Sequence, residues 1–344
     1  MIELGIGMFG DVQINDQTGE IQSASKRMKE ILEEIKLMDQ VGLDFFGMGE
    51  HHREDYAVSS PEILLAAAAS ITENIKLGSA VSVISSADPV KLYQDFSMVD
   101  LLSDGRAEIM AGRGSFTESF PLFGQQLQNY DALFDEKLKL LIQINENEEI
   151  TWTGRFRPSL NNQKIYPQPK NGKLPIWVAV GGTPQSVIRA GKLGLPVMFA
   201  IIGGTLERFQ PLFEYYRQAW EDNGHSMNDF QVGVHMHALF GDDSQEIADW
   251  YYPFYSSQMN RIGKSRGWPT YQRNQYDFGR SKSGHLNVGD PAYAIDKILY
   301  AIELFGLTRF SAHMDVGAPD HAKMMKSIEI YGDKIAPKIR EALQ

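Results

Sequence analysis

The stretch IKLGSAVSVISSADPVKLYQDFSMVDLLSDGRAEIMAGRGS, residues 75–115, contains in one piece the unit that decides the fold. Its two ends carry short β-prone runs, at residues 75–83 and 107–111. Between them Asp88-Pro89 opens a helical segment, because aspartate caps helices well and proline is tolerated in the first turn. A strand, a capped helix and a second strand in this order predict two parallel strands joined by a crossover helix.

The same alternation extends along the rest of the chain. Further strands are predicted at residues 2–8, 44–48, 176–180, 196–200, 231–240 and 309–314, which makes about eight in total. Further helix starts with a capping residue and proline stand at Ser60-Pro61, Thr183-Pro184 and Asp290-Pro291. Eight such units in a chain of 344 residues favour a closed (β/α)₈ TIM barrel over an open doubly wound sheet.

No linker, internal repeat or low-complexity tract divides the chain, so we expect a single barrel domain over residues 1–344. Two stretches depart from the simple repeat. Residues 150–169 include TWTGRF, which predicts a hairpin, and residues 251–290 are rich in Tyr, Arg, Ser and Gly with weak periodicity. Long irregular insertions in a compact domain commonly act as lids or binding loops.

Composition excludes several classes of protein. Lys and Arg number 33 against 44 Asp and Glu, a net charge of −11 with no basic run, which argues against a nucleic-acid partner. The longest apolar run, residues 63–71, is far shorter than the roughly 20 residues that span a bilayer. With no cysteine, redox chemistry has to come from a bound cofactor. The start, MIELGIGMFG, lacks signal-peptide features, so we expect a cytoplasmic protein.

The residues after each strand are the informative ones, because a parallel barrel has its active site at the carboxyl ends of its strands. Gly181, Gly182 and Thr183 follow the strand at residues 176–180 and precede a helix, which is the order that an anion site requires. The alternative is a tight turn. Arg113, between two glycines, can pair with a phosphate through two hydrogen bonds, and the alternative is a surface ion pair.

Histidines form a second group of candidates. His51 and His52 follow a strand, where a neutral imidazole can act as general base or hydrogen-bond donor. There are two alternatives. The segment could be a solvated loop without a catalytic role, or the protein could be a metal-dependent barrel hydrolase that uses both histidines. His235, His237 and His313 fall in predicted strands, where a hydrogen-bonded core role is favoured over a catalytic one.

Taken together, four segments resemble the bacterial luciferase-like family of flavin-dependent monooxygenases, and the resemblance covers nearly the whole chain. They are GLDFFGMGEHHRED, KLGSAVSVISSADPVKLYQDFSMVDLLSDGRAEIMAGRG, IWVAVGGTPQSVIRAGKLGLP and the region from NVGDP to APKIR. The resemblance implies a (β/α)₈ barrel with a flavin at its carboxyl end.

The resemblance also implies roles for individual residues. His51 matches the family's histidine beside the reactive edge of the flavin. Ala80-Val81 matches a non-proline cis peptide bond against the ring. The phosphate-binding positions correspond to Arg113, Gly181, Gly182, Thr183 and Ser186. Two departures weaken any expectation of light emission: Gly112 replaces luciferase's reactive cysteine, and acidic or neutral residues around Asp131 replace a second phosphate-contacting arginine of the luciferase α subunit.

The resulting hypothesis is a flavoprotein that uses FMN, bound or received reduced from a separate flavin reductase, with dioxygen on a small organic substrate. One alternative keeps the fold and uses the deazaflavin F420 for hydride transfer. Another is a non-catalytic flavin-binding protein, in which replacing His51 changes nothing. No metal, membrane or nucleic acid is expected, and the resemblance implies a homodimer formed through helices near the first strands.

Overall fold

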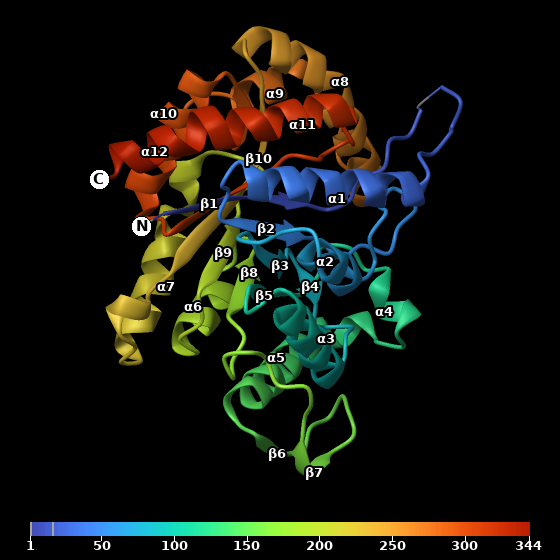
Figure 1. Cartoon of the computed structure of the whole chain (residues 1–344), viewed down its shortest axis with the longest axis vertical. Coiled ribbons are helices and arrows are strands. Elements are labelled where there is room, and N and C mark those ends of the chain that lie inside the picture. The colour runs from blue at the N-terminus through green and yellow to red at the C-terminus, as the bar shows by residue number, and fades with distance from the viewer. Residues whose placement is uncertain (1, 16) are drawn as a thin grey trace.

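Eight parallel strands close into a barrel at the centre of the protein, as the sequence predicts (Figure 1). A computed structural model of the chain describes residues 2–15 and 17–344. Each strand pairs with the next, and the last pairs with the first. Around the barrel the strands are β1 (Glu3–Met8), β2 (Phe45–Met48), β3 (Lys76–Ser79), β5 (Ala107–Gly112), β8 (Ile176–Val180), β9 (Val197–Ala200), β10 (Val232–Phe240) and β12 (Arg309–His313).

Two short strands extend the barrel at its carboxyl end. β4 (Ser82–Val83) follows β3 after a cis peptide bond between Ala80 and Val81, and it pairs with β5. β11 (Leu286–Gly289) pairs with the last four residues of β10. The predicted strand at residues 75–83 is therefore divided in two, and β11 has no counterpart in the sequence prediction.

Helices cover the outside of the barrel (Figure 1). They are α1 (Ala24–Gln40), α2 (Pro61–Ala69), α3 (Pro89–Leu102), α5 (Tyr130–Glu146), α6 (Pro184–Lys192), α7 (Gln210–Asp222), α10 (Pro291–Phe305), α11 (His321–Glu329) and α12 (Ala336–Ala342). The shorter turns are α4 (Ser119–Leu122), η1 (Leu127–Asn129), η2 (Leu206–Phe209), η3 (Met227–Asp229) and the π-helical η4 (Ile330–Ile335). The helix starts predicted at Ser60, Asp88, Thr183 and Asp290 are confirmed. Across residues 2–15 and 17–344, no helix has the apolar stretch that a bilayer crossing requires.

The two stretches that depart from the repeat differ in structure. TWTGRF lies in an antiparallel hairpin of β6 (Glu149–Trp152) and β7 (Leu160–Lys164), as predicted. The interpretation of residues 251–290 as a long irregular insertion is wrong, because α8 (Ser244–Arg266) and α9 (Arg273–Gly279) occupy much of it. Tyr251 and Tyr255 are fully buried on α8. Tertiary burial of aromatic side chains, rather than helix propensity, therefore stabilises this helix.

The amino end of the barrel is closed by a buried ion-pair cluster. Arg309 on β12 donates to both carboxylate oxygens of Glu108 on β5, and to Glu3 on β1 at 2.7 Å. The Arg309 guanidinium also lies 4.4 Å and 4.2 Å from the ring centres of Phe45 and Trp177. These charges and rings fill the barrel, so a ligand has access from the carboxyl end.

Small residues face inward at the carboxyl end of the barrel between β5 and β9, a region that we call the mouth. The cluster below this mouth consists of Met110, Trp177 and Met198. Since side chains alternate along a strand, the residues two positions further also face inward. These are Gly112, Ala179 and Ala200, and the two alanines are partly exposed. Small apolar residues therefore face the carboxyl end of the barrel between β5 and β9, and we call these three residues the floor of the mouth.

Candidate active site

Arg113 and Ser186 meet at the rim between β5 and β8. Arg113 follows β5, and Ser186 lies in the first turn of α6. Arg113 Nη2 donates to Ser186 Oγ at 3.1 Å, and the hydroxyl oxygens of Ser186 and Thr183 are 2.7 Å apart. The structure therefore brings together a guanidinium and two hydroxyl groups, as expected for residues that follow parallel strands of one barrel.

The amino terminus of α6 is accessible to a ligand. The N-cap Thr183 makes no side-chain capping bond within the described chain, whereas Asp88 and Asp290 cap α3 and α10 in this way. Gly181 and Gly182 before it are exposed, and a Cβ added at Gly181 would meet no described atom within 4 Å. Uncapped N–H groups, the positive end of the helix dipole and the neighbouring guanidinium fit a phosphate group.

The cis peptide bond between Ala80 and Val81 lies at the position that the family resemblance implies. Just beyond it, the Val83 N–H donates to Glu50 Oε2 at 2.7 Å, which ties the segment after β3 to the segment after β2. The Val81 side chain packs against the apolar cluster below the mouth. This segment therefore contributes to the wall beside the floor.

His51 lies on the β2 side of the mouth, in aromatic surroundings. Its ring stacks on Tyr56 with centroids 4.2 Å apart, and it contacts Phe9 at 4.7 Å and Phe116 at 5.4 Å. Burial, with a contribution from His313, lowers the pKa of His51 to about 3. At neutral pH the imidazole is therefore uncharged and offers one N–H donor and one lone pair.

His52 has different surroundings from His51. Its Nε2 lies 2.8 Å from Glu50 Oε1, and its ring contacts Phe123 with centroids 5.2 Å apart. Metal ligands have to converge on one point. The separate partners of His51 and His52 therefore argue against the metal-dependent hydrolase alternative.

Three further histidines lie inside the barrel, in the hydrogen-bonded role that the sequence favours. His235 Nδ1 lies 3.0 Å from Ser311 Oγ, and His237 Nδ1 lies 2.9 Å from the Tyr255 hydroxyl. Burial, and then the neighbouring His313, lower the pKa of His235 and His237 well below their usual range. Both imidazoles are therefore uncharged at neutral pH.

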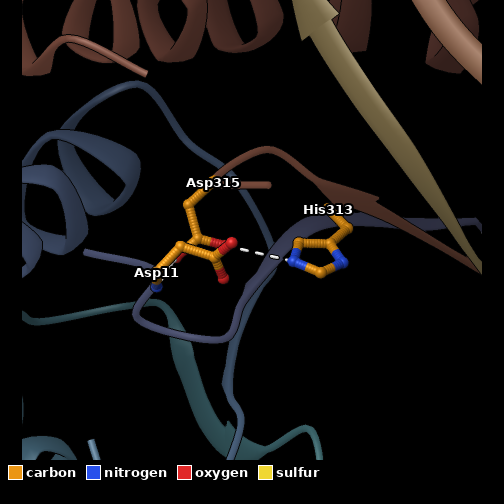
Figure 2. A group of neighbouring side chains, drawn as sticks. All are labelled: Asp11, His313 and Asp315. Carbon is orange, nitrogen blue, oxygen red and sulfur yellow. Dashed lines mark hydrogen bonds and ion pairs between the residues drawn. The ribbon is translucent and has the colours of Figure 1, made fainter. Parts of the chain in front are cut away.

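The third of these histidines, His313, belongs to a buried group with Asp11 and Asp315 (Figure 2). The Asp315 carboxylate accepts a hydrogen bond from His313 Nε2 at 3.1 Å. It also accepts hydrogen bonds from the N–H groups of residues 9–11 at 2.8 to 3.3 Å, and the Arg27 guanidinium lies 3.5 Å from it. Burial would raise the pKa of Asp315, but His313, Arg27 and the N–H donors bring it to about 2. Burial and the Asp315 charge raise the pKa of Asp11.

This group acts as a hydrogen-bonded anchor. Its ligand atoms lie within 4.8 Å of one another, as metal ligands do. However, N–H donors already use the lone pairs of Asp315, and the Arg27 guanidinium beside it repels a cation. The group fixes the loop after β1 and thereby places Phe9 against His51.

Phe116 and the segment after β5 cover His51. The Phe116 ring lies between two guanidinium groups, with Arg53 Cζ at 4.6 Å and Arg266 Cζ at 5.4 Å from its centroid. Arg266, at the end of α8, also donates to the Ser115 carbonyl at 3.1 Å. The cavity left beside His51 is about 10 Å³, room for one water at most. Residues 114–124 thus form a lid over His51. Residues 251–290, where a lid or binding loop is expected from the sequence, contribute Arg266 to it.

Two contributors are absent from the sequence predictions, Tyr56 and Asp315. Asp315 comes directly after the strand predicted at residues 309–314. Its position at the carboxyl end of a barrel strand could therefore have identified it as a candidate site residue. Tyr56 stacks on His51 because the chain after β2 turns back and forms a bridge with Asp11. No local pattern in the sequence signals that contact.

Comparison with known proteins agrees with this architecture. The sequence profile of the luciferase-like monooxygenases matches residues 6–321, and the chain belongs to this family. It is 26% identical to the uncharacterized protein y4vJ of Sinorhizobium fredii, covering 95% of this chain and 96% of that protein. It is 23% identical to an alkanal monooxygenase alpha chain of Photorhabdus laumondii, covering 97% and 98%.

Solved structures share the fold at lower identity. Monooxygenase RslO1 from Streptomyces bottropensis superposes with a TM-score of 0.85 and 21% identity. The oxygenating constituent of 3,6-diketocamphane monooxygenase from Pseudomonas putida, in complex with FMN, gives 0.77 and 20%. The coenzyme F420 dependent tetrahydromethanopterin reductase from Methanopyrus kandleri gives 0.74 and 17%. Each superposition covers 98% of this chain and 99% of the other.

Proposed function

We propose that this protein is a flavin-dependent oxidoreductase that uses reduced FMN and dioxygen to oxygenate a small organic substrate. The observation that carries the proposal is the convergence of Arg113, Ser186 and the uncapped start of α6 on one rim of the mouth. These donors suit a phosphate group, and the apolar floor beside them suits a flat ring. FMN combines both features, and a chain without cysteine needs such a cofactor for redox chemistry.

Each part of the site then has a task. Arg113, Ser186 and the first N–H groups of α6 would hold the phosphate, while Val81 and the cluster around Met198 would support the ring. When bound, reduced flavin would supply two of the four electrons that reduce dioxygen; the substrate would supply the other two as it takes up one oxygen atom, and the second oxygen atom would leave as water. His51, uncharged and buried, holds a proton on one ring nitrogen and can donate or accept a hydrogen bond beside the ring. The lid around Phe116 keeps bulk water away.

A His51→Gln variant tests this assignment. We expect it to bind FMN within about threefold of the wild type, while the reaction of protein-bound reduced FMN with dioxygen slows about a hundredfold, a typical contribution of general acid–base catalysis. Stopped-flow absorbance of the flavin measures the rate. His52→Gln is the matched control and should retain the wild-type rate within about threefold, because His52 bonds to Glu50 instead. An unchanged rate in His51→Gln would favour the non-catalytic flavin-binding alternative.

The second candidate function is F420-dependent hydride transfer without oxygen. The same rim offers donors for the phosphodiester of F420, and F420-dependent proteins share this fold at a TM-score of 0.74. Anaerobic titration separates the two. We expect saturable uptake of FMN and no change in the 420 nm absorbance band of F420, and a tight F420 complex with no uptake of FMN would replace our proposal.

We also propose two protein partners. A separate flavin reductase would deliver reduced FMN, since the site has to receive its electrons from outside the chain. A second copy of the chain would cover apolar side chains on the packed helices α2 and α3, where Ile63 is 71% and Leu102 is 62% exposed. Met98, Leu101 and Ile71 extend this apolar face. Several exposed apolar side chains on two neighbouring helices are typical of an interface.

The homodimer is tested by introducing charge into the α2 and α3 face. We expect the wild type to be a dimer by light scattering and the Ile63→Glu/Leu102→Glu variant to be a monomer, because two buried carboxylates per subunit oppose association. Leu122→Glu is the control, since Leu122 is equally exposed but lies on α4. It should remain dimeric. A monomeric wild type, or a dimeric double variant, would contradict the proposed interface.

A further inference from the structure

The guanidinium at the proposed phosphate rim already has an anionic partner. Arg113 Nη1 donates to Asp131 Oδ1 at 2.8 Å, opposite the hydrogen bond from Nη2 to Ser186. Asp131 lies in the first turn of α5 and is 70% exposed. Its carboxylate therefore occupies, in the free protein, a donor that a phosphate oxygen would otherwise take.

The position of Arg113 does not depend on Asp131 alone. The guanidinium lies over the Tyr130 ring, 5.3 Å from its centroid, and the Tyr130 hydroxyl donates to the Gly114 carbonyl at 2.7 Å. Ser186 accepts from the other side. Besides Asp131, two contacts thus hold Arg113 at the rim, one with the Tyr130 ring and one with Ser186, and Asp131 contributes mainly its charge.

The rim as a whole carries little net positive charge. The next cation on α6, Arg189, pairs with Asp135, one turn further along α5, at 2.7 Å. Both cations that face α5 are therefore matched by a carboxylate, in a chain whose net charge is −11. A phosphate monoester carries between one and two negative charges at neutral pH and would arrive next to the Asp131 carboxylate. Repulsion between the two anions opposes tight binding.

We propose, on the basis of the flavin function above, that Asp131 is an affinity-determining residue of the cofactor site: it competes with the cofactor's phosphate for Arg113 and keeps binding weak and reversible. FMN then exchanges with solution between turnovers instead of remaining as a prosthetic group. This fits a site that has to receive its cofactor in the reduced form. Riboflavin lacks the phosphate, so its affinity for the protein does not depend on the charge of Asp131.

Asp131→Asn isolates the charge, because the amide oxygen still accepts from Arg113 Nη1 and the exposed position tolerates the change. The matched control is Asp135→Asn, which removes the same charge from the same helix but next to Arg189. Oxidised FMN and riboflavin are titrated into each protein at low salt, and flavin fluorescence gives the dissociation constants. Inorganic phosphate is then added as a competitor for FMN.

We expect Asp131→Asn to bind FMN about tenfold more tightly than the wild type, with riboflavin affinity unchanged within about twofold. Asp135→Asn should change neither constant by more than about threefold. Equal FMN affinity in the wild type and Asp131→Asn, or equal tightening for riboflavin, would overturn the role of Asp131 while leaving the flavin function intact. A wild type that takes up neither flavin would overturn the proposed function and this role with it.

Discussion

Acidification from pH 7.5 to 5 is expected to lower the free energy of unfolding by on the order of 4 kcal/mol. Burial lowers the pKa of four histidines: His51 to about 3, His285 to about 4, and His235 and His237 well below 6.5. The unfolded chain binds protons at these imidazoles from about pH 6.5 downwards, and the folded protein does not. Protonation of these four imidazoles therefore favours the unfolded chain throughout the range from pH 7.5 to 5.

Groups whose pKa is raised in the folded protein oppose the trend, among them Asp11, Glu62 and His321, and the shift of Asp11 is the large one. Burial and the charge of Asp315 raise the pKa of Asp11, so the folded protein keeps a proton there that the unfolded chain releases above about pH 3.9. On unfolding around pH 5.5, the four imidazoles together take up nearly four protons and Asp11 releases one. The net uptake is therefore roughly two to three protons. Each proton changes the free energy of unfolding by about 1.4 kcal/mol per pH unit.

Urea unfolding at several pH values between 7.5 and 5 measures this dependence. His285→Asn should reduce the pH dependence by about one proton, and the asparagine amide can still donate to the Gly204 carbonyl that His285 Nδ1 contacts. A midpoint that stays constant from pH 7.5 to 5 would contradict the uncharged state of the buried histidines.

Arg309→Met is expected to cost about 3 to 5 kcal/mol of stability at neutral pH, because it leaves the Glu108 carboxylate buried without its partner. Glu108 is 5% exposed and both of its oxygens accept from Arg309. The Phe45 and Trp177 rings would also lose the guanidinium that lies between them. The urea midpoint of the variant measures the loss.

A second substitution separates the unpaired charge from a simple packing defect. In Arg309→Met/Glu108→Leu both charges are replaced by apolar groups, and we expect most of the stability to return. Lys282→Met, which breaks an exposed pair with Asp296, should change stability by less than about 0.5 kcal/mol. A double variant as unstable as Arg309→Met would show that the cost comes from packing and not from an isolated carboxylate.

The elements that the sequence predicts correctly have strong local signals. Short apolar runs mark most of the barrel strands, and a capping residue followed by proline marks four helix starts. β11 consists of only LNVG and lies beside a stretch without clear periodicity, so no pattern distinguishes it. α8 carries Pro253 and several aromatic residues with low helix propensity, and burial against the barrel overrides that preference.

The site shows the same division. Arg113, Thr183 and Ser186 could be grouped in advance, because residues after parallel barrel strands share one end of the molecule. A surface ion pair was an alternative for Arg113, but its partner Asp131 could not be predicted, and neither could the contacts of Phe116 with Arg53 and Arg266. These contacts depend on the paths of loops and on the end of α8, and no spacing in the sequence encodes them.

A crystal structure of the protein with FMN tests the central claim most directly. The account predicts phosphate oxygens within about 2.7 to 3.2 Å of the Arg113 guanidinium, Ser186 Oγ and N–H groups of the first turn of α6. It also predicts the ring over the floor formed by Gly112, Ala179 and Ala200, on the side of the mouth that faces His51. A phosphate bound elsewhere, or crystals and solutions in which FMN shows no saturable uptake, would contradict it.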